Sequence, residues 1–308
     1  MKTPILFRAS YMGDLMTDGD GMITEKQLAT IEEYKSKVSL TDKQREELNK
    51  LIYKRDNPEI STTCLSRLIK VYAEHYYGRT EDVSNKYTEK GTTVEEDSIT
   101  LHSMVKNRFF KKNEIRVNNS FFTGCPDIYD GETLTESEEI TDIKSSWSLI
   151  TFLNAKHSKK INHDYKWQGN TYLVLLPKAK TFRLSYCLVN ATAKLILDEK
   201  FSLQRKMGFF DPIMADEDPT YKEKCQQIER NHIFDLGLFL KHNPGFDLHT
   251  PLSDWSHDIP KEKRVHEFVW PRDNSAIEKM YARARHCKDL IESWENGTIN
   301  RKVEVNET

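Results

Sequence analysis

The spacing of hydrophobic residues changes along this chain, and this change constrains the fold more than any other feature. Residues 64–77 repeat apolar side chains every three or four positions, as one face of a helix does. Residues 181–189 alternate apolar and other side chains, which indicates a strand. Short extended runs at 115–129 and 138–145, and then a helical segment at 163–176, lie between them. The order of these segments predicts a mixed α/β core.

Helical patterns flank this core on both sides. Thr41 and Gln44 have the spacing of a capping box at the start of one N-terminal helix. Ser275 and Glu278 have the same spacing before the last apolar stripe, and a strand is expected at 264–270. We expect one domain over the 308 residues. It consists of a helical part at 1–80, a catalytic core at 91–190 and a C-terminal addition at 200–308 that ends in a helix.

Composition limits the classes of function. The net charge of −2 gives no global attraction to nucleic acid, so such a partner must be held by local patches. Basic residues gather at 106–116 and 156–160, although a charge run is also typical of a solvated face. No apolar run has the length of a membrane span and no signal segment is visible, so we expect a cytoplasmic protein without a membrane partner. The five cysteines include no CxxC pair, which argues against a disulfide framework or a zinc ribbon.

The segment EEITDIKSSW at 138–147 places Asp142 and Lys144 two residues apart at the end of an expected strand. Side chains with that spacing point to the same face of a strand. Alone this is a weak signal, because any solvated strand can alternate charges. A simple surface ion pair is the alternative.

A second acidic residue strengthens the signal. Asp127 lies fifteen residues before Asp142, follows a proline and precedes an expected turn at 130–131. A β-hairpin would bring the two aspartates onto adjacent strands. Two carboxylates at that distance repel each other unless a cation lies between them, and oxygen ligands suit Mg²⁺ or Mn²⁺. Lys144 would then lie where it can orient a nucleophilic water.

A third acid is expected from a helix predicted at 91–105. Thr92 and Glu95 have the spacing of a capping box, so a structural role for Glu95 is the alternative. Glu96 shares its helical face with polar residues, whereas Glu95 borders an apolar line that includes Leu101. Glu95 is therefore the residue expected to point inward.

An amide is the fourth candidate. Gln168 lies one turn from both Tyr165 and Tyr172 on the helix expected at 163–176. Gly169 beside it permits a close approach of the backbone. A buried amide that is hydrogen-bonded within the core is the alternative. In the company of the acids and the lysine, we expect Gln168 to face the metal site.

The order of these motifs resembles that of the PD-(D/E)XK nuclease superfamily. It looks most like the branch that contains the RecB nuclease domain and the YqaJ/lambda exonuclease family. The order is more specific than any single motif. The matching elements are a glycine four residues before the acid, GxPD, DIKSS and Q-x-x-x-Y, at 91–95, 124–127, 142–146 and 168–172.

The resemblance implies a restriction-endonuclease-like core, in which a mixed central sheet is flanked by helices, with helical N- and C-terminal additions. It implies that Lys144 assists the nucleophilic water and that Gln168 positions the site. The residues implied to bind Mg²⁺ or Mn²⁺ are Glu95, Asp127, Asp142 and, through its carbonyl, Ile143.

A second match lies near the N-terminus. Residues 8–17 are similar to the segment in which lambda-type exonucleases hold the DNA 5′-phosphate with a serine and an upstream arginine. Ser10 fits the serine, whereas Thr3 stands where the arginine is expected and Arg8 is nearby. The chain lacks the C-terminal cysteine cluster of the iron–sulfur members, so no such cluster is expected. The residues expected to contact DNA are Arg8, Ser10, Lys111, Lys112, Lys159, Lys160 and Tyr172.

The resemblance implies a Mg²⁺-dependent deoxyribonuclease that acts as a 5′→3′ exonuclease on double-stranded ends in phage-type recombination. Its location would be the cytoplasm, that of a bacterial host if the chain is phage-encoded. The alternatives are a structure-specific or single-strand nuclease with the same motifs, and a catalytically silent DNA-binding module. A homo-oligomer and a single-strand annealing protein are compatible further partners.

Residues 16–27 imitate part of a calcium-binding loop. Asp18 and Asp20 occupy two ligand positions of an EF-hand. Met16 and Gln27 stand at the first and twelfth positions, where the loop needs an acid and a bidentate carboxylate. We therefore expect a turn that leads into a helix and no calcium site.

Overall fold

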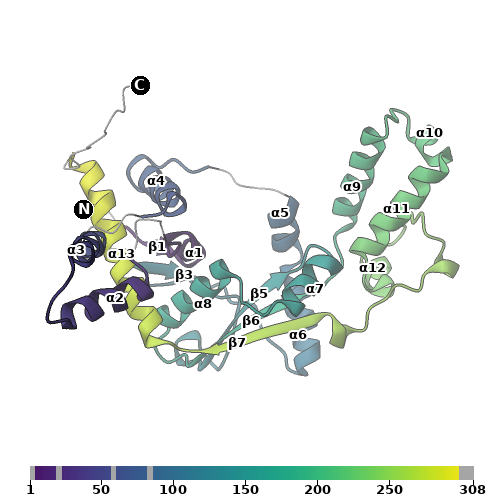
Figure 1. The fold of residues 1–308 in the computed structure, drawn as a ribbon. Helices are drawn as coiled ribbons and strands as arrows, with labels where there is room; N and C mark the ends of the chain where they lie inside the picture. Colours follow the sequence, from purple (N-terminus) through teal and green to yellow (C-terminus); the bar gives the residue numbers. More distant parts are fainter. Residues whose placement is uncertain (1–3, 19–22, 57–59, 82–85, 298–308) are drawn as a thin grey trace.

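The computed structural model describes residues 4–18, 23–56, 60–81 and 86–297. A four-stranded sheet forms its centre (Figure 1). In order across the sheet, the strands are β4 (Ile128–Asp130), β5 (Glu139–Ser145), β6 (Thr181–Cys187) and β7 (Val265–Pro271). β5 and β6 are parallel, while the two outer pairs are antiparallel, so the sheet is mixed as expected. The strands predicted at 138–145, 181–189 and 264–270 are confirmed.

A smaller three-stranded sheet lies beside the N-terminal elements. Its strands, in order, are β1 (Phe7–Arg8), β3 (Phe122–Gly124) and β2 (Val117–Asn118). The N-terminal part, expected to be helical, thus also provides a strand, because Phe7 pairs with Phe122 in parallel register. The C-terminal part provides β7 to the central sheet.

Two helices form the crossover that parallel strands require. The chain runs from β5 through α7 (Leu149–His157) and α8 (His163–Leu175) before it returns as β6. α8 packs on the face of the sheet that carries Phe182 and Leu184. Gly169 makes this close approach possible, because a Cβ at this position would lie only 2.5 Å from the Phe182 ring.

The opposite face of the sheet is covered by α6 (Glu95–Lys106), whose Ile99 packs with Ile143. The segment expected to form one helix at 91–105 belongs to two helices, α5 (Lys86–Thr93) and α6. Val94 interrupts the helix between them, because its ψ of 15° is not helical. Val94 is the N-cap of α6 and has no side-chain cap, so the capping box proposed for Thr92 and Glu95 is wrong.

Helices from the described N-terminal and C-terminal parts of the chain meet in one hydrophobic core (Figure 1). Met12 and Leu68 from the N-terminal part pack with Met280 from the last helix. The helices involved are α1 (Met12–Leu15), α4 (Thr62–Tyr77) and α13 (Asn274–Glu295). The N-cap of α13 is Asp273 and not Ser275 as expected, since the Asp273 carboxylate accepts hydrogen bonds from the backbone of Ser275 and Ala276.

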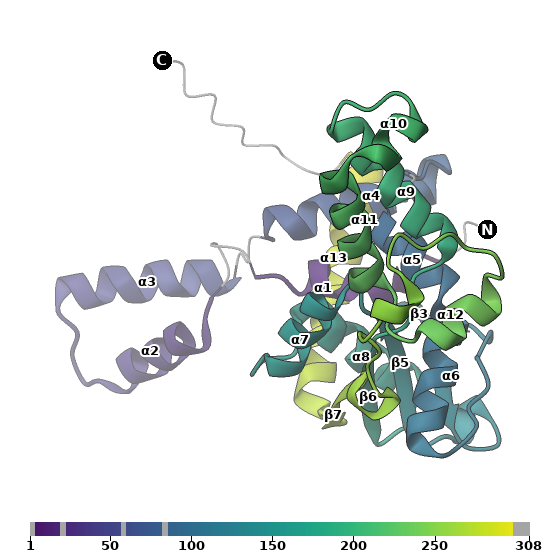
Figure 2. The same ribbon diagram turned by 90° about the vertical axis from the view of Figure 1, so that its right-hand side faces the viewer.

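Helices α2 (Glu25–Ser36) and α3 (Asp42–Asp56) extend away from the rest of the molecule (Figure 2). The capping box of Thr41 and Gln44 is confirmed at the start of α3. In the segment that imitates a calcium loop, Gln27 closes a capping box with Thr24 at the start of α2. The loop residues 19–22, which include Asp20, lie outside the described residues.

A helical arm occupies much of the region that sequence patterns left unexplained, and it projects from the sheet at the upper right of Figure 1. A buried ion pair joins its helices, because Lys200 Nζ lies 2.7 Å from Glu229 Oε1. Hydrogen bonds from His249, Lys200 and Thr250 outweigh burial and lower the pKa of Glu229 to about 2. The helices of the arm are α9 (Ala193–Lys206), α10 (Pro212–Glu217), α11 (Pro219–His232) and α12 (Leu236–His242). Within the described residues, no helix combines the length and the hydrophobicity needed to cross a membrane.

Candidate active site

A β-hairpin brings the two predicted aspartates together. β4 and β5 pair with Ile128 opposite Thr141, so Asp127 and Asp142 are next to each other at the following position of the hairpin. The Asp127 carboxylate accepts a hydrogen bond of 2.6 Å from the backbone N–H of Ile143. Asp142 is 2% exposed. The structure therefore holds two carboxylates side by side with little access to water.

This arrangement is electrostatically costly without a cation. Burial and the neighbouring Asp142 raise the pKa of Asp127 well above its usual range. Lys144 Nζ lies 2.7 Å from Asp142 Oδ2, yet that oxygen receives no well-directed hydrogen bond. Although burial opposes it, attraction to Asp142 and Asp127 raises the pKa of Lys144, so its amine remains charged. One lysine thus compensates two carboxylates only in part.

Gln168 connects the aspartate to the lysine. Its Nε2 donates to Asp142 Oδ1 at 3.1 Å and to the Tyr172 hydroxyl oxygen at 3.1 Å. Its Oε1 accepts a hydrogen bond of 3.3 Å from Lys144. Tyr172 in turn donates to the carbonyl of Cys125 at 3.2 Å. Tyr172, which was expected to contact DNA, is only 4% exposed and supports Gln168 from below the surface.

Tyr165 is a member of this cluster to which sequence reasoning assigned no role of its own. Lys144 Nζ lies 4.7 Å from the centre of the Tyr165 ring, within the range of a cation–π interaction. The ring therefore limits the positions that the ammonium can take. The signal in the sequence was the spacing of Tyr165 one turn before Gln168 on the same helix.

Glu95 lies at the edge of this cluster. It is the first residue of α6, and its charge contributes to the raised pKa of Asp127. Its carboxylate forms an ion pair of 2.9 Å with Lys112, one of the lysines expected to contact DNA. In the described parts of the chain, no three His, Cys, Asp or Glu side chains are close enough together to hold a metal ion.

The donor set fits a divalent cation with two protein carboxylates. Asp127 and Asp142 supply hard oxygen ligands, and Asp142 Oδ2 is a buried oxygen whose only partner among the described residues is the Lys144 ammonium, without a well-directed hydrogen bond. Together with the Ile143 carbonyl, these oxygens suit Mg²⁺ or Mn²⁺, which keep several positions for water and substrate. In this structure a Glu95 carboxylate oxygen accepts a hydrogen bond from Lys112. Metal binding by Glu95 therefore stays a prediction.

The other residues expected to contact DNA differ in their surroundings. Arg8 forms an ion pair with Glu74, and Ser10 is exposed in the short 3₁₀ helix that follows β1. Thr3, at the position of the missing arginine, lies outside the described residues. Three of the lysines expected to contact DNA are exposed and have no acidic partner among the described residues, namely Lys111, Lys159 and Lys160.

Two further cations of the basic run at 106–116 have acidic partners, since Lys106 pairs with Glu267 and Arg108 with Asp130. With the Lys112 pair, three of its basic residues are engaged within the protein. The charge of this run is therefore less available to phosphate than the sequence suggested.

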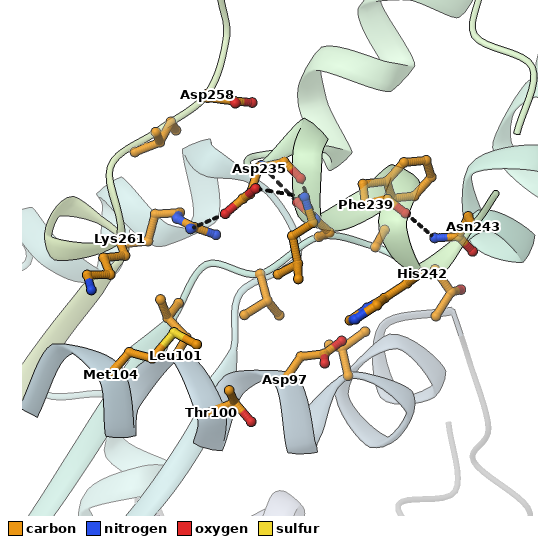
Figure 3. Close-up of a pocket in the computed structure, with 18 of the residues that line it drawn as sticks. Asp97, Thr100, Leu101, Met104, Asp235, Phe239, His242, Asn243, Asp258 and Lys261 are labelled. Carbon is orange, nitrogen blue, oxygen red and sulfur yellow. Dashed lines mark hydrogen bonds and ion pairs between the residues drawn. The ribbon is translucent and has the colours of Figure 1, made fainter. Parts of the chain in front are cut away.

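A cavity of about 830 Å³ lies on the other side of α6, between this helix and α12 (Figure 3). Asp97 and Met104 line it from α6, while Phe239 and His242 line it from α12. None of the predicted catalytic side chains lines it. The cavity is therefore separate from the aspartate pair.

Comparisons with known proteins support the fold. No protein-family model matches the sequence, and no curated protein matches it. A solved structure of a phage-related exonuclease from Haemophilus somnus 129PT is similar with a TM-score of 0.57 and 18% identity, over 96% of this chain and 98% of that one. An alkaline exonuclease from Laribacter hongkongensis is similar with a TM-score of 0.50 and 10% identity, over 95% of this chain and 93% of that one.

These likenesses confirm the fold class that the motifs implied. The chain has a mixed α/β fold of the restriction-endonuclease-like type, which it shares with these exonucleases over nearly its whole length. The fold that the resemblance to the YqaJ/lambda exonuclease branch implied is therefore the fold that these comparisons show.

Proposed function

We propose that this protein is a metal-dependent DNA nuclease that hydrolyses phosphodiester bonds. The observation that carries the proposal is the pair formed by the half-buried Asp127 and the buried Asp142 beside the charged Lys144. A binding module has no use for carboxylates that face phosphate, because like charges repel. The names of the structural neighbours, both exonucleases, favour this activity and a DNA substrate.

Each side chain has a distinct task in this proposal. Asp127 and Asp142 would hold a divalent cation, which would stabilise the negative charge that develops on the scissile phosphate. Lys144 orients the attacking water and stabilises negative charge on the phosphate oxygens. Gln168 keeps Asp142 and Lys144 in register through its two hydrogen bonds. Tyr165 holds the Lys144 ammonium from its other side.

In its finer form, the proposal is a 5′→3′ exonuclease that acts on duplex ends in phage-type recombination within the cytoplasm. The likeness to a phage-related exonuclease over 96% of this chain supports this form. A structure-specific or single-strand nuclease would use the same residues and remains the second candidate. The same hypothesis includes assembly into a homo-oligomer and a single-strand annealing protein as a partner.

The test compares end-labelled linear duplex DNA with closed circular DNA, in Mg²⁺ and in EDTA. The wild type should degrade the linear form in Mg²⁺ only. Asp142→Asn and Lys144→Ala should lower the rate by about a hundredfold or more, because each removes a charge at the reacting phosphate. Lys178→Ala, which removes an exposed lysine paired with Glu136, should leave the rate unchanged.

The outcomes separate the candidates. Loss of the linear form alone indicates an exonuclease, and labels at either end report the polarity. Nicking of the circles indicates the second candidate. Wild-type rates in both active-site variants, or cleavage in EDTA, would show that these residues do not form the catalytic site.

A further inference from the structure

A buried lysine binds the chain where it leaves strand β5. Lys90 on α5 is 1% exposed. Its Nζ donates hydrogen bonds to the carbonyl oxygens of Ser146 at 2.9 Å and Trp147 at 2.8 Å. These residues directly follow β5, the strand of Asp142 and Lys144. Lys90 therefore holds the backbone just beyond the proposed catalytic strand.

The other contacts of Lys90 are aromatic. Its Nζ lies 5.7 Å from the centre of the Trp147 ring and 5.8 Å from that of Phe234. Lys90 forms no ion pair with a carboxylate in the described part of the chain, and burial lowers its pKa to about 7. A polar group buried in such surroundings is costly unless its hydrogen bonds are needed. The two carbonyls are the contacts that compensate this cost.

Lys90 also belongs to the segment that carries Glu95. α5 continues through Val94 directly into α6, whose first residue is Glu95. Hydrogen bonds therefore join Lys90 to the end of β5, while the main chain joins it to Glu95. Ser98 of α6 and Ser145 of β5 make a second link between this segment and the strand, with hydroxyl oxygens 2.8 Å apart. Phe234, which lies between α11 and α12, connects the arm to this junction.

We propose that Lys90 is a positioning residue, which fixes the helix of Glu95 against the end of the strand that carries Asp142 and Lys144. The proposal rests on the nuclease function proposed above. Lys90 itself contacts neither DNA nor the reacting atoms. A neutral amine keeps two N–H donors, so both carbonyls can be held in either protonation state.

The test replaces Lys90 with methionine, which keeps the volume and removes the donors. For Lys90→Met we expect kcat per folded molecule to fall by about ten- to a hundredfold, because small misplacements of catalytic groups are costly. The KM for DNA should stay the same, since the DNA-contacting surface is unchanged. Lys90→Arg, which can donate to both carbonyls, should recover most of the activity.

A second measurement does not depend on DNA cleavage. Calorimetric titration with Mn²⁺ should show a weaker affinity in Lys90→Met than in the wild type, since the acidic groups are held less well together. Circular dichroism gives the folded fraction for each variant. If Lys90→Met does not fold, Lys90→Gln keeps an N–H donor group on a shorter side chain and should show the same losses to a smaller extent.

Lys200→Met is the matched control. It makes the same change at another buried lysine, but in the arm, where it removes the Lys200 ammonium that pairs with Glu229. Its Tm should fall while kcat per folded molecule stays at the wild-type value.

Wild-type kcat and Mn²⁺ affinity in Lys90→Met would overturn the proposal. So would an equal loss of kcat in Lys200→Met, which would reveal a general effect of destabilisation. A wild type that cleaves no DNA contradicts the nuclease function instead, and the Mn²⁺ affinities then decide whether Lys90 positions the acids.

Discussion

Burial gives Asp142 and Lys144 properties that the same residues would lack on a surface. An exposed ion pair contributes about 0–1 kcal/mol, because water screens both charges. Here the Asp142 side chain is 3% exposed and that of Lys144 is 24% exposed. The alternative of a simple surface pair is therefore wrong. A charged amine fixed beside carboxylates in a place with little water can act strongly on an approaching phosphate.

His102 gives a prediction about pH at the scale of one residue. It is 1% exposed, and its Nδ1 lies 2.9 Å from the Ser185 hydroxyl and 3.6 Å from Glu267. Burial, with smaller effects of nearby charges, lowers the pKa of His102 to about 4 from its usual 6.5. Between these two pKa values the unfolded chain binds more protons at His102 than the folded chain does. The contribution of His102 to stability is therefore fully present above pH 6.5 and is lost as pH falls towards 4.

The measurement is the free energy of unfolding in urea at several pH values between 4 and 7. The contribution of His102 over this range is of the order of 3 kcal/mol. His102→Gln should remove this part of the pH dependence, and His157→Gln, at an exposed position, should keep it. Parallel curves for the wild type and His102→Gln would contradict the prediction.

At the scale of elements, α8 connects the sheet to the site. It packs on β6 through Tyr172, which stacks on Phe182, and it carries Gln168 to the aspartate and the lysine of β5. The position of Gln168 therefore depends on how closely the helix approaches the sheet. Gly169 sets that approach, because a Cβ there would lie 2.5 Å from Phe182 and 2.6 Å from Trp270.

Gly169→Ala should consequently push α8 away from the sheet. We expect a loss of about 1–3 kcal/mol in the free energy of unfolding, as for other overpacked cores. The rate of DNA cleavage should fall as well, because Gln168 moves with the helix. Thermal unfolding and the nuclease assay on the same samples measure both effects.

Gly91→Ala is the control for this prediction. Gly91 lies in α5, and a Cβ there would meet no atom within 4 Å. Alanine is the better helix former, so this variant should be up to about 1 kcal/mol more stable. Equal stability of Gly169→Ala and the wild type would show that the helix can be lifted from the sheet without strain.

At the scale of the whole molecule, the ends of the chain are parts of the same core as the sheet. Ile5 and Ile291 belong to one hydrophobic cluster, and β7 is the edge strand of the central sheet. The segments that sequence patterns described as additions thus contribute to the core itself. Both the N-terminal and the C-terminal parts therefore help to shape the core around the central sheet.

Net charge at this scale predicts how DNA is bound. With a total of −2, attraction must come from exposed local cations such as Lys111, Lys159 and Lys160. Their joint replacement by alanine should weaken DNA binding. The slope of log K against log salt should become shallower by about 0.9 for each phosphate contact that is lost. Fluorescence anisotropy with labelled duplex in the Asp142→Asn background measures this slope without cleavage.

The matched control removes three lysines from the helices that extend away from the body in Figure 2. Joint replacement of Lys26, Lys43 and Lys50 changes the net charge equally but should leave the slope nearly unchanged. Equal effects of the two triple variants would mean that only total charge matters. No effect of the first would mean that DNA follows another surface.

The sequence by itself determined the elements whose signals are local. Hydrophobic period depends on neighbours along the chain, so the helix expected at 163–176 and the strand expected at 181–189 agree with α8 and β6. The closeness of Asp127 and Asp142 was also predictable, because a short hairpin fixes the register of its strands.

Only the tertiary structure decided which distant groups meet. The pairing of Glu95 with Lys112, the burial of Lys90 under Trp147 and the cap of α13 by Asp273 depend on packing and on competition between alternative partners. Periodicity carries no information about such contacts, since it reports the face of an element and not what lies opposite. The sequence therefore determined the residues of the proposed site, and the packing of α5, α6 and α8 around the sheet decided how each of them is held.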